Sequence, residues 1–285
     1  IRRPVIVFTP LLAEELAGAR ALELTPTLGD AARISAWRSS GGGPWHLAID
    51  TGMNRSGVAW DRVGELKDIL ATVPPEGAFT HFHSAERNDG SIALQQQRFR
   101  EALAMLPAVP RYLHAENSPA VERQSPSPWS LARSGVFLYG GGGEAGAETA
   151  PECVASFHAR IVDLRTIVAG DTVSYGATWT ATGTRRIATA AAGYADGIRR
   201  CLGNRGHALV NGRRAPIVGV VTMDMAMLDV TDLDCSVGDV ATFLGRQGRA
   251  ELALGDVAAS GDLSPYELLV GLKLRAPRVY LEPPA

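Results

Sequence analysis

Apolar strand-like runs alternate with helix-like segments through the first half of the chain. The runs are "VIVF", "LELTPTL", "WHLAID", "GAFTHFHSA", "RYLHAENS" and "SGVFLYG". The helical segments cover about Ala13–Ala21, Asp30–Ser39, Asp61–Ala71 and Ser91–Met105, with Asp30 as an N-cap. Strands that alternate with helices predict a parallel sheet. Six strands predict an α/β barrel that lacks the first two βα units of a (β/α)8 barrel.

After residue 150 the pattern changes to short strands separated by glycine turns. Asn211-Gly212, between two apolar runs, is the strongest hairpin signal in the chain. A helix over about Ser264–Lys273 and a final strand "RVYLE" follow. We therefore predict a barrel domain over 1–148 and a mostly antiparallel β domain over 149–285. The stretch "YGGGGEAGAETAPE" is interpreted as the linker, because no helix with a Lys or Ser/Thr start follows its glycines, as a phosphate-binding loop would require.

The composition describes a globular protein that binds neither nucleic acid nor membrane. Hydrophobic residues make up 46% of the 285 residues, and the net charge of -2 comes without a basic block. No segment approaches the ~20 apolar residues of a membrane helix, and the first residues are predicted to form a strand and a helix rather than a signal peptide. The three cysteines are far apart in the sequence, which favours free thiols in a reducing cytoplasm.

The motif "THFHSAE" places His81 and His83 two residues apart on a predicted strand, so their side chains would share one face. With His114 at a later strand end, they could form the metal site of a barrel hydrolase. We favour the alternative, in which one histidine works without metal and the other packs. The "SGVFLYG" strand lacks the aspartate that such a metal site usually takes as its last ligand.

Two further motifs end strands with small hydrogen-bonding residues. Asn117, Ser118 and the backbone near Gly135 could hold an anion such as phosphate, because donors at adjacent strand ends converge. Asn-Ser-Pro alone is more often a helix N-cap, but the nearby Arg133 favours an anion site. Asp224 lies between two methionines, and we expect this carboxylate to be paired or to face a site.

Nine motifs together resemble the alanine racemase family, in family order and over the whole chain. They are "HLAIDTGMNRSG", "THFHSAE", "HAENSPA", "ARSGVFLYG", "VSYGATW", "AAGYADG", "GVVTMDM", "SPYELL" and "LRAPRVYLE". The resemblance implies fold type III, pyridoxal 5'-phosphate (PLP) as the cofactor, and interconversion of L- and D-alanine by two-base proton transfer. It also implies a cytoplasmic, head-to-tail homodimer that supplies D-alanine for peptidoglycan. Residue 1 would correspond to the start of the family's third barrel strand.

The resemblance assigns roles to individual residues. Tyr194 would take the α-proton of the L-amino acid, His81 would lie beside the PLP ring, and Arg133 would face the pyridine nitrogen. Cofactor contacts would come from Ser118, Asn117, Gly135, Val136 and Tyr266, in addition to Arg133 and His81. Arg55, Met223 and Asp224 would bind the substrate. Tyr194 and the segment with Met223 and Asp224 would come from the partner subunit.

Several positions depart from the family pattern. Ala48 stands where many members have a lysine, often carbamylated, and Glu86 and Val220 replace a common Asp and Arg. The Schiff-base lysine belongs on the first barrel strand, and neither Lys67 nor Lys273 can replace it. We expect that this strand lies outside the 285 residues. A relative that binds PLP without turnover, and a racemase for serine or a broader range of amino acids, are the alternatives.

Overall fold

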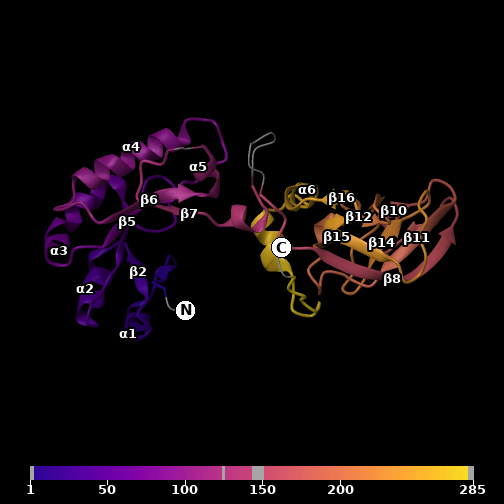
Figure 1. Ribbon diagram of the computed structural model, residues 1–285, viewed down its shortest axis with the longest axis horizontal. Helices are drawn as coiled ribbons and strands as arrows, with labels where there is room; N and C mark the ends of the chain where they lie inside the picture. Colours follow the sequence, from indigo (N-terminus) through magenta and orange to yellow (C-terminus); the bar gives the residue numbers. More distant parts are fainter. Residues whose placement is uncertain (1–2, 124–125, 143–150, 282–285) are drawn as a thin grey trace. The chain divides into compact units, whose positions relative to one another are not determined.

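The computed structural model describes residues 3–123, 126–142 and 151–281. Two compact units, Ile1–Gly135 (unit 1) and Val136–Ala285 (unit 2), are described separately below (Figure 1). The boundary expected between residues 148 and 149 lies within the stretch 143–150, which is outside the described residues.

Unit 1 contains a parallel sheet whose strands alternate with helices. The sheet has the order β1-β2-β3-β5-β6-β7, all in parallel pairs, with β4 added beside β3. These six principal strands confirm the predicted α/β barrel topology. The elements are β1 (Ile6–Val7), η1 (Ala13–Glu15), α1 (Leu16–Ala21), β2 (Thr25–Leu28), α2 (Ala31–Ser39), β3 (His46–Asp50), β4 (Val58–Ala59), η2 (Trp60–Leu66), α3 (Lys67–Thr72), β5 (Gly77–Phe79), α4 (Ser91–Ala104), β6 (Tyr112–Asn117), α5 (Ser118–Arg123) and β7 (Leu131–Arg133).

Local sequence explains these elements well. The Asp30 carboxylate accepts a hydrogen bond from the Arg33 N–H at 2.8 Å, so the predicted N-cap of α2 is confirmed. All four residues of β2 and the first four of β3 are buried, as expected for central strands of a parallel sheet. The helices complete a core around Trp37 and Trp45.

The sixth strand lies earlier than predicted. We expected "SGVFLYG" to form it, but β7 ends at Arg133 and Val136–Tyr139 forms the short helix η3 of unit 2. The Gly141 N–H donates to the Val136 carbonyl oxygen at 3.0 Å, which closes this turn. A four-residue apolar run has too little periodicity to distinguish a turn of helix from a strand.

Unit 2 is built on an antiparallel sheet of the order β13-β12-β15-β8-β11-β14, with β16 paired to β15. Every pair is antiparallel, which confirms the predicted β domain. A separate two-stranded sheet joins β9 and β10. The elements are β8 (Phe157–Ile167), β9 (Thr172–Val173), η4 (Tyr175–Ala177), β10 (Trp179–Thr180), β11 (Arg185–Ala190), η5 (Arg200–Leu202), β12 (His207–Val210), β13 (Arg213–Pro216), β14 (Ala226–Asp229), β15 (Val240–Gln247), β16 (Ala250–Leu252), α6 (Leu254–Ser260) and α7 (Pro265–Gly271).

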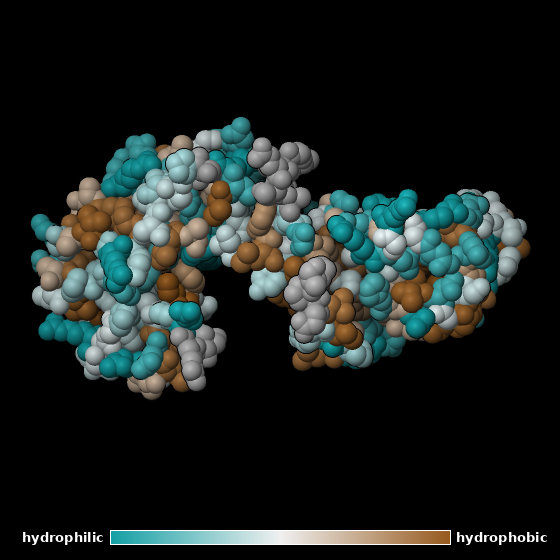
Figure 2. All heavy atoms as spheres, in the orientation of Figure 1, coloured by the Kyte–Doolittle hydropathy of each residue, from teal (hydrophilic) through white to brown (hydrophobic). Residues whose placement is uncertain are grey.

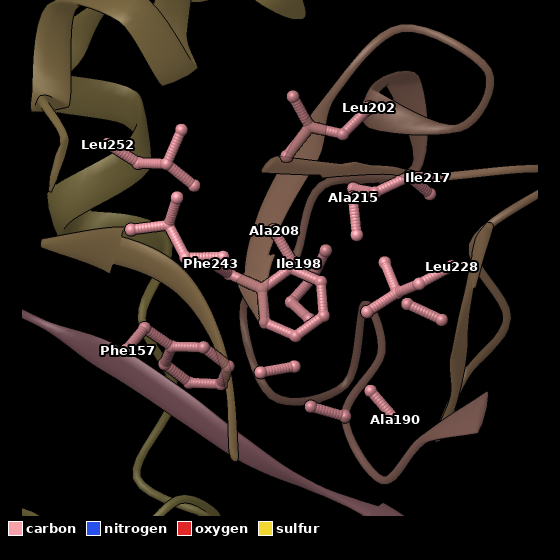
Figure 3. Packing of buried hydrophobic residues seen from close by; sticks show 14 of the residues in the cluster. Phe157, Ala190, Ile198, Leu202, Ala208, Ala215, Ile217, Leu228, Phe243 and Leu252 are labelled. Atoms are coloured by element: carbon pink, nitrogen blue, oxygen red, sulfur yellow. The ribbon is translucent and has the colours of Figure 1, made fainter. Parts of the chain in front are cut away.

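The hairpin prediction in unit 2 is confirmed. Asn211 and Gly212 join β12 to β13 with φ of 48° and 75°, the left-handed conformation that a two-residue turn of this type requires. The sheet and its helices enclose a core that includes Phe157, Phe243 and Leu252 (Figure 3). Ser264 caps α7 by accepting from the Tyr266 N–H at 3.3 Å, with Pro265 in the first turn.

The final strand predicted over "RVYLE" is wrong for residues 278–281, which form no strand. Val279, Tyr280 and Leu281 are each more than three-quarters exposed. An alternating apolar run becomes a strand only where a sheet edge is free to pair with it.

Hydrophilic and hydrophobic residues are interspersed over the face of both units shown in Figure 2. Within the described ranges, none of the helices combines the length and apolar character needed to cross a membrane.

Candidate active site

A cavity of about 270 Å³ opens in unit 1 at the carboxyl ends of its parallel strands. Ala48 and Asp50 line it from β3, His81 from the segment after β5, and Arg133 from the end of β7. Arg55, from the loop after β3, completes this group. Binding groups collect at such strand ends in α/β folds. The structure thus brings together three of the predicted site residues, Arg55, His81 and Arg133.

Arg133 is held by a set of neutral acceptors. Its guanidinium donates to the Thr80 and Ala115 carbonyl oxygens at 2.8 and 3.1 Å and to Nδ1 of His114 at 2.7 Å. It also lies 5.5 Å from the ring centroids of Phe8 and Phe79. Burial lowers the pKa of Arg133 to about 10, so the group stays charged at neutral pH.

The contact with Arg133 fixes the protonation of two buried histidines. An arginine can only donate, so Nδ1 of His114 is an acceptor and the proton of that ring is on Nε2. The His114 Nε2–H therefore donates to Nδ1 of His46, 2.7 Å away. Burial and then the Arg133 charge lower the pKa of His114 to about 3 and that of His46 to about 4. Both imidazoles are neutral at physiological pH, and no carboxylate in the described part of the chain forms an ion pair with Arg133.

This network gives a stability prediction at Gly77. A Cβ at this position would lie 2.5 Å from both Cε1 and Nδ1 of His46, the nitrogen that accepts from His114. We expect Gly77→Ala to lower the free energy of unfolding of unit 1 by about 1–3 kcal/mol, the usual range for overpacking. Gly18→Ala is the control, because no atom lies within 4 Å of its Cβ and alanine favours a helix. Urea unfolding measures both variants, and equal stability in the two would contradict the packing argument.

His81 and His83 lie beyond the end of β5, so the expectation that they share one face of a strand, on which the metal alternative depended, is wrong. β5 ends at Phe79, so the alternation of a strand does not extend to these residues. Nδ1 of His81 lies 3.4 Å from the Arg133 guanidinium, whereas Nδ1 of His83 pairs with the Ser84 hydroxyl at 2.7 Å. Burial, then the charges of Arg133 and Arg55, lower the pKa of His81 to about 4. Among the residues with described positions, no group of three or more His, Cys, Asp or Glu could hold a metal ion.

The predicted phosphate-binding residues of unit 1 lie at adjacent strand ends. The buried Ser118 hydroxyl accepts from the Gly135 N–H at 2.8 Å, linking the region after β6 with the end of β7. The Asn117 side chain accepts from the Ala120 N–H at 3.3 Å and donates to the Phe82 carbonyl oxygen at 3.3 Å. Asn117 therefore caps the short helix α5, which was the structural alternative. Val136 belongs to η3 of unit 2.

The loop that carries Arg55 packs closely on β3. The Asp50 carboxylate accepts from the Gly52 N–H at 2.8 Å, so it is turned to the loop. A Cβ on Gly57 would lie 2.8 Å from the Ala48 carbonyl oxygen, and a Cβ on Gly29 would lie 2.6 Å from Gly57 Cα. Arg55 itself is exposed, and no ion pair with it is found within the described ranges.

The remaining predicted residues lie in unit 2. Tyr194 is 42% exposed, and its N–H donates to the Thr222 carbonyl oxygen at 3.0 Å. This contact brings Tyr194 to the segment of Met223 and Asp224. Asp224 pairs with Arg275 at 2.7 Å, which confirms that its carboxylate is partnered. Tyr266, the last of the predicted site residues in unit 2, is exposed on α7.

Sequence reasoning missed three residues of these networks, His46, Asp196 and Arg275, and considered His114 only as a metal ligand. His46 and His114 support Arg133, and Asp196 and Arg275 surround the Tyr194 turn. The available signals were an apolar strand that begins with histidine, "HLAID", and the first arginine of "LRAPRVYLE".

The fold is that of an α/β-barrel enzyme with a C-terminal β domain, and comparisons with known proteins define it further. The model of the alanine racemase N-terminal domain matches residues 1–142, and that of the C-terminal domain matches residues 154–280. The chain therefore belongs to the alanine racemase family, whose members are isomerases that use PLP.

Relatives and solved structures agree with this assignment. An alanine racemase of Sorangium cellulosum is 36% identical over 304 residues, which cover 99% of this chain and 80% of that protein. One from Symbiobacterium thermophilum is 38% identical, over 82% of this chain and 65% of that protein. The structure of alanine racemase from Bartonella henselae with covalently bound pyridoxal phosphate has a TM-score of 0.88 at 26% identity, over 98% of this chain and 79% of that one. The Bacillus anthracis enzyme with bound L-Ala-P has a TM-score of 0.87 at 28% identity, over 99% and 77%.

Proposed function

We propose that the chain binds PLP in the unit 1 cavity and interconverts L- and D-alanine. One observation carries the proposal: the cavity is lined by an arginine, Arg133, that keeps its charge among neutral acceptors and lies beside His81. When bound, PLP supplies an electron-withdrawing ring that acidifies the α-proton of an amino acid. An arginine facing the ring nitrogen cannot give up a proton to it, which favours simple reprotonation over transamination.

The residues present fit the ring and the phosphate of PLP. Arg133 offers a donor toward a ring nitrogen, and the Ser118 hydroxyl and the Gly135 N–H form a hydrogen-bonding pair at the neighbouring strand end. Asn117 would add a contact to the cofactor within unit 1. No lysine lines the cavity, since Lys67 begins α3 and Lys273 follows α7. The covalent attachment that the family uses therefore has no partner at this cavity among the described residues.

We further propose that Tyr194 takes the α-proton from the L-face and that Met223 and Asp224 line the substrate carboxylate site. The ordinary pKa of a phenol is ~10, so this base needs a positively charged or hydrogen-bonded environment. Arg55 would hold the substrate carboxylate. The exposure of Tyr194 and Met223 within unit 2 supports a head-to-tail homodimer in which these residues serve the partner's cavity. The free cysteines accord with a cytoplasmic enzyme. We propose that its product, D-alanine, is used for peptidoglycan.

Cofactor binding and proton exchange test the proposal directly. We expect the chain to retain PLP through gel filtration and to exchange the α-proton of alanine with solvent deuterium. Borohydride reduction followed by peptide mass mapping identifies any lysine that carries the cofactor. Arg133→Gln should lose PLP, whereas Arg111→Gln, which removes an exposed guanidinium lying over Tyr112, should keep it. Retention of PLP without any exchange would favour the alternative of a non-catalytic relative.

The preferred amino acid follows from the same assay. Ala48 lines the cavity near Arg55 without filling the volume of a lysine side chain, which supports serine or a broader range as the alternative substrates. Glu86, which is exposed, and Val220, which is half-buried, lie outside this cavity. A kcat/KM for serine above that for alanine would replace alanine as the proposed substrate.

The pairing of Arg55 yields a prediction about halide. Ala48 provides no charge, and Asp50 is turned to its loop, so we expect a small anion such as chloride beside Ala48 and Arg55. Because Arg55 is exposed, its interaction with the anion should contribute about 0.2–1 kcal/mol, which corresponds to a change in activity of up to about fivefold. Chloride titration at constant ionic strength measures it. Ala48→Lys should remove the dependence if that lysine is carbamylated, and activity independent of chloride in the unmodified chain would exclude the anion.

A further inference from the structure

The turn that carries Tyr194 packs backbone to backbone on the Thr222–Met223 segment. The Tyr194 N–H donates to the Thr222 carbonyl oxygen and the Ala195 N–H to that of Met223, both at 3.0 Å. Gly193 makes this approach possible, because a Cβ there would lie 2.2 Å from the Thr222 carbonyl oxygen. The turn and the segment therefore share one boundary with no side chain between them.

Arg275 spans the same boundary through its side chain. Its Nε and Nη2 donate to the two carboxylate oxygens of Asp196, at 2.7 and 3.0 Å. Its remaining nitrogen, Nη1, lies 2.7 Å from a carboxylate oxygen of Asp224. Asp196 belongs to the Tyr194 turn and Asp224 follows Met223, so one planar guanidinium connects both. A lysine could not make these three contacts from one rigid group.

Asp196 is built to receive the guanidinium. Its side chain is buried and also accepts from the Gly193 N–H at 2.9 Å, which closes the turn. Burial opposes its ionisation, but the Arg275 and Gly193 hydrogen bonds keep the pKa of Asp196 below its ordinary value. The Asp196 carbonyl oxygen also accepts from the Lys273 N–H at 3.1 Å, so the segment bearing Arg275 is attached by its backbone too.

On the side opposite Tyr194, the Tyr194 turn is anchored by the hydrophobic core of unit 2. Ile198 is buried in the core of unit 2 near Phe243 and Ala208 (Figure 3). The side of the turn that bears Tyr194 is instead half-exposed, as are Asp224 and Arg275. Arg275 thus connects the turn to the Met223–Asp224 segment on the side that the core does not reach.

We propose that Arg275 is a positioning residue that holds the Tyr194 turn against the Met223–Asp224 segment and offsets one of the two negative charges of Asp196 and Asp224. The structural part of this inference stands on unit 2 alone, and its catalytic consequence rests on the proposed function. The link sets the distance between the phenol that moves the α-proton and the backbone that faces the substrate carboxylate. Without the guanidinium, Asp196 and Asp224 would leave two uncompensated negative charges beside an anionic substrate group.

Amide hydrogen exchange tests the link without cofactor or substrate. We expect Arg275→Ala to speed exchange of the Tyr194 and Ala195 amides by about tenfold, while amides of the β12–β13 hairpin keep their protection. Arg246→Ala is the matched control, because it removes a guanidinium of β15 that pairs with Glu251 of β16, and it should change neither amide. Less than about a twofold change in Arg275→Ala would overturn the proposal. Loss of protection throughout unit 2 in both Arg275→Ala and Arg275→Lys would also overturn it, because Arg275 would then support the whole fold.

Exchange kinetics of Arg275 variants distinguish the role of its positive charge from the role of its planar geometry. Arg275→Lys keeps the positive charge but not the fork, so we expect a KM for alanine near the unmodified value and slow exchange from the L-face. Arg275→Ala should also raise KM. A full recovery of L-face exchange in Arg275→Lys would show that the charge alone matters and would overturn the positioning role. Absence of exchange in the unmodified chain would refute the proposed function, whereas the amide measurement would still decide whether Arg275 joins the two segments.

Discussion

Tyr194→Phe should slow exchange of the α-proton of L-alanine by about 10²–10⁴-fold more than exchange of the α-proton of D-alanine. Loss of a general base removes roughly 3–5 kcal/mol of barrier lowering, and a base on one face of the substrate acts on one enantiomer only. The structure supports this choice, because the Tyr194 turn is fixed to the Met223 segment while its phenyl ring stays half-exposed.

Deuterium incorporation into each enantiomer, in the presence of PLP, measures this asymmetry. Tyr175→Phe is the matched control, since Tyr175 is 74% exposed in η4 of the same unit and makes no contact that the proposal uses. Equal losses for both enantiomers would remove Tyr194 from the role of L-face base. A normal L-face rate in Tyr194→Phe would transfer the role to another residue.

Unit 1 should lose stability steeply as the pH falls from 6.5 toward 4. Above pH 6.5, His46 and His114 are neutral in both the folded and the unfolded chain. Below it, the unfolded chain binds protons, but the folded chain does not, because the pKa values are lowered to about 4 and about 3. At about 1.4 kcal/mol per pKa unit, protonation of each histidine should lower the free energy of unfolding of unit 1 by on the order of 3 kcal/mol across this interval.

Urea unfolding followed by tryptophan fluorescence measures the effect, because Trp37, Trp45, Trp60 and Trp129 lie in unit 1 and only Trp179 lies in unit 2. His46→Asn should make the pH profile less steep, with His114 still contributing, since the amide oxygen can accept the His114 N–H and the new side chain does not titrate. His83→Asn, at an exposed histidine, should leave the profile as it is. A His46→Asn profile as steep as that of the unmodified chain would contradict the assignment of neutral buried histidines.

Much of the fold was predictable because its signals are local. The N-cap Asp30, the Asn211-Gly212 turn and the alternation of strands with helices each depend on neighbouring residues. Errors occurred where tertiary pairing decides, as in "RVYLE", which has no strand partner in the described residues, and in "SGVFLYG", which forms a turn of helix. His81 and His83 were assigned to one face because the end of β5 is not marked in the sequence.

Sequence motifs single out individual residues of the candidate site, but not the networks that hold them. Motifs identified Arg133 and Asp224, yet their partners are distant in sequence. His46 lies 68 residues before His114, and Asp196 lies 79 residues before Arg275. The sequence carries no period that links such positions, so their contacts emerge only once the chain has folded.

The two glycines beside the Arg55 loop have a consequence for how substrate preference can change. Because Gly57 and Gly29 meet main chain directly, a side chain at either position would displace the wall of the cavity that presents Arg55. That wall therefore offers little tolerance for adjustment. Ala48, in contrast, reaches the cavity with a single methyl group, so new side chains can enter there while the wall stays in place. Changes in the preferred amino acid should accordingly accumulate at Ala48 rather than in the loop.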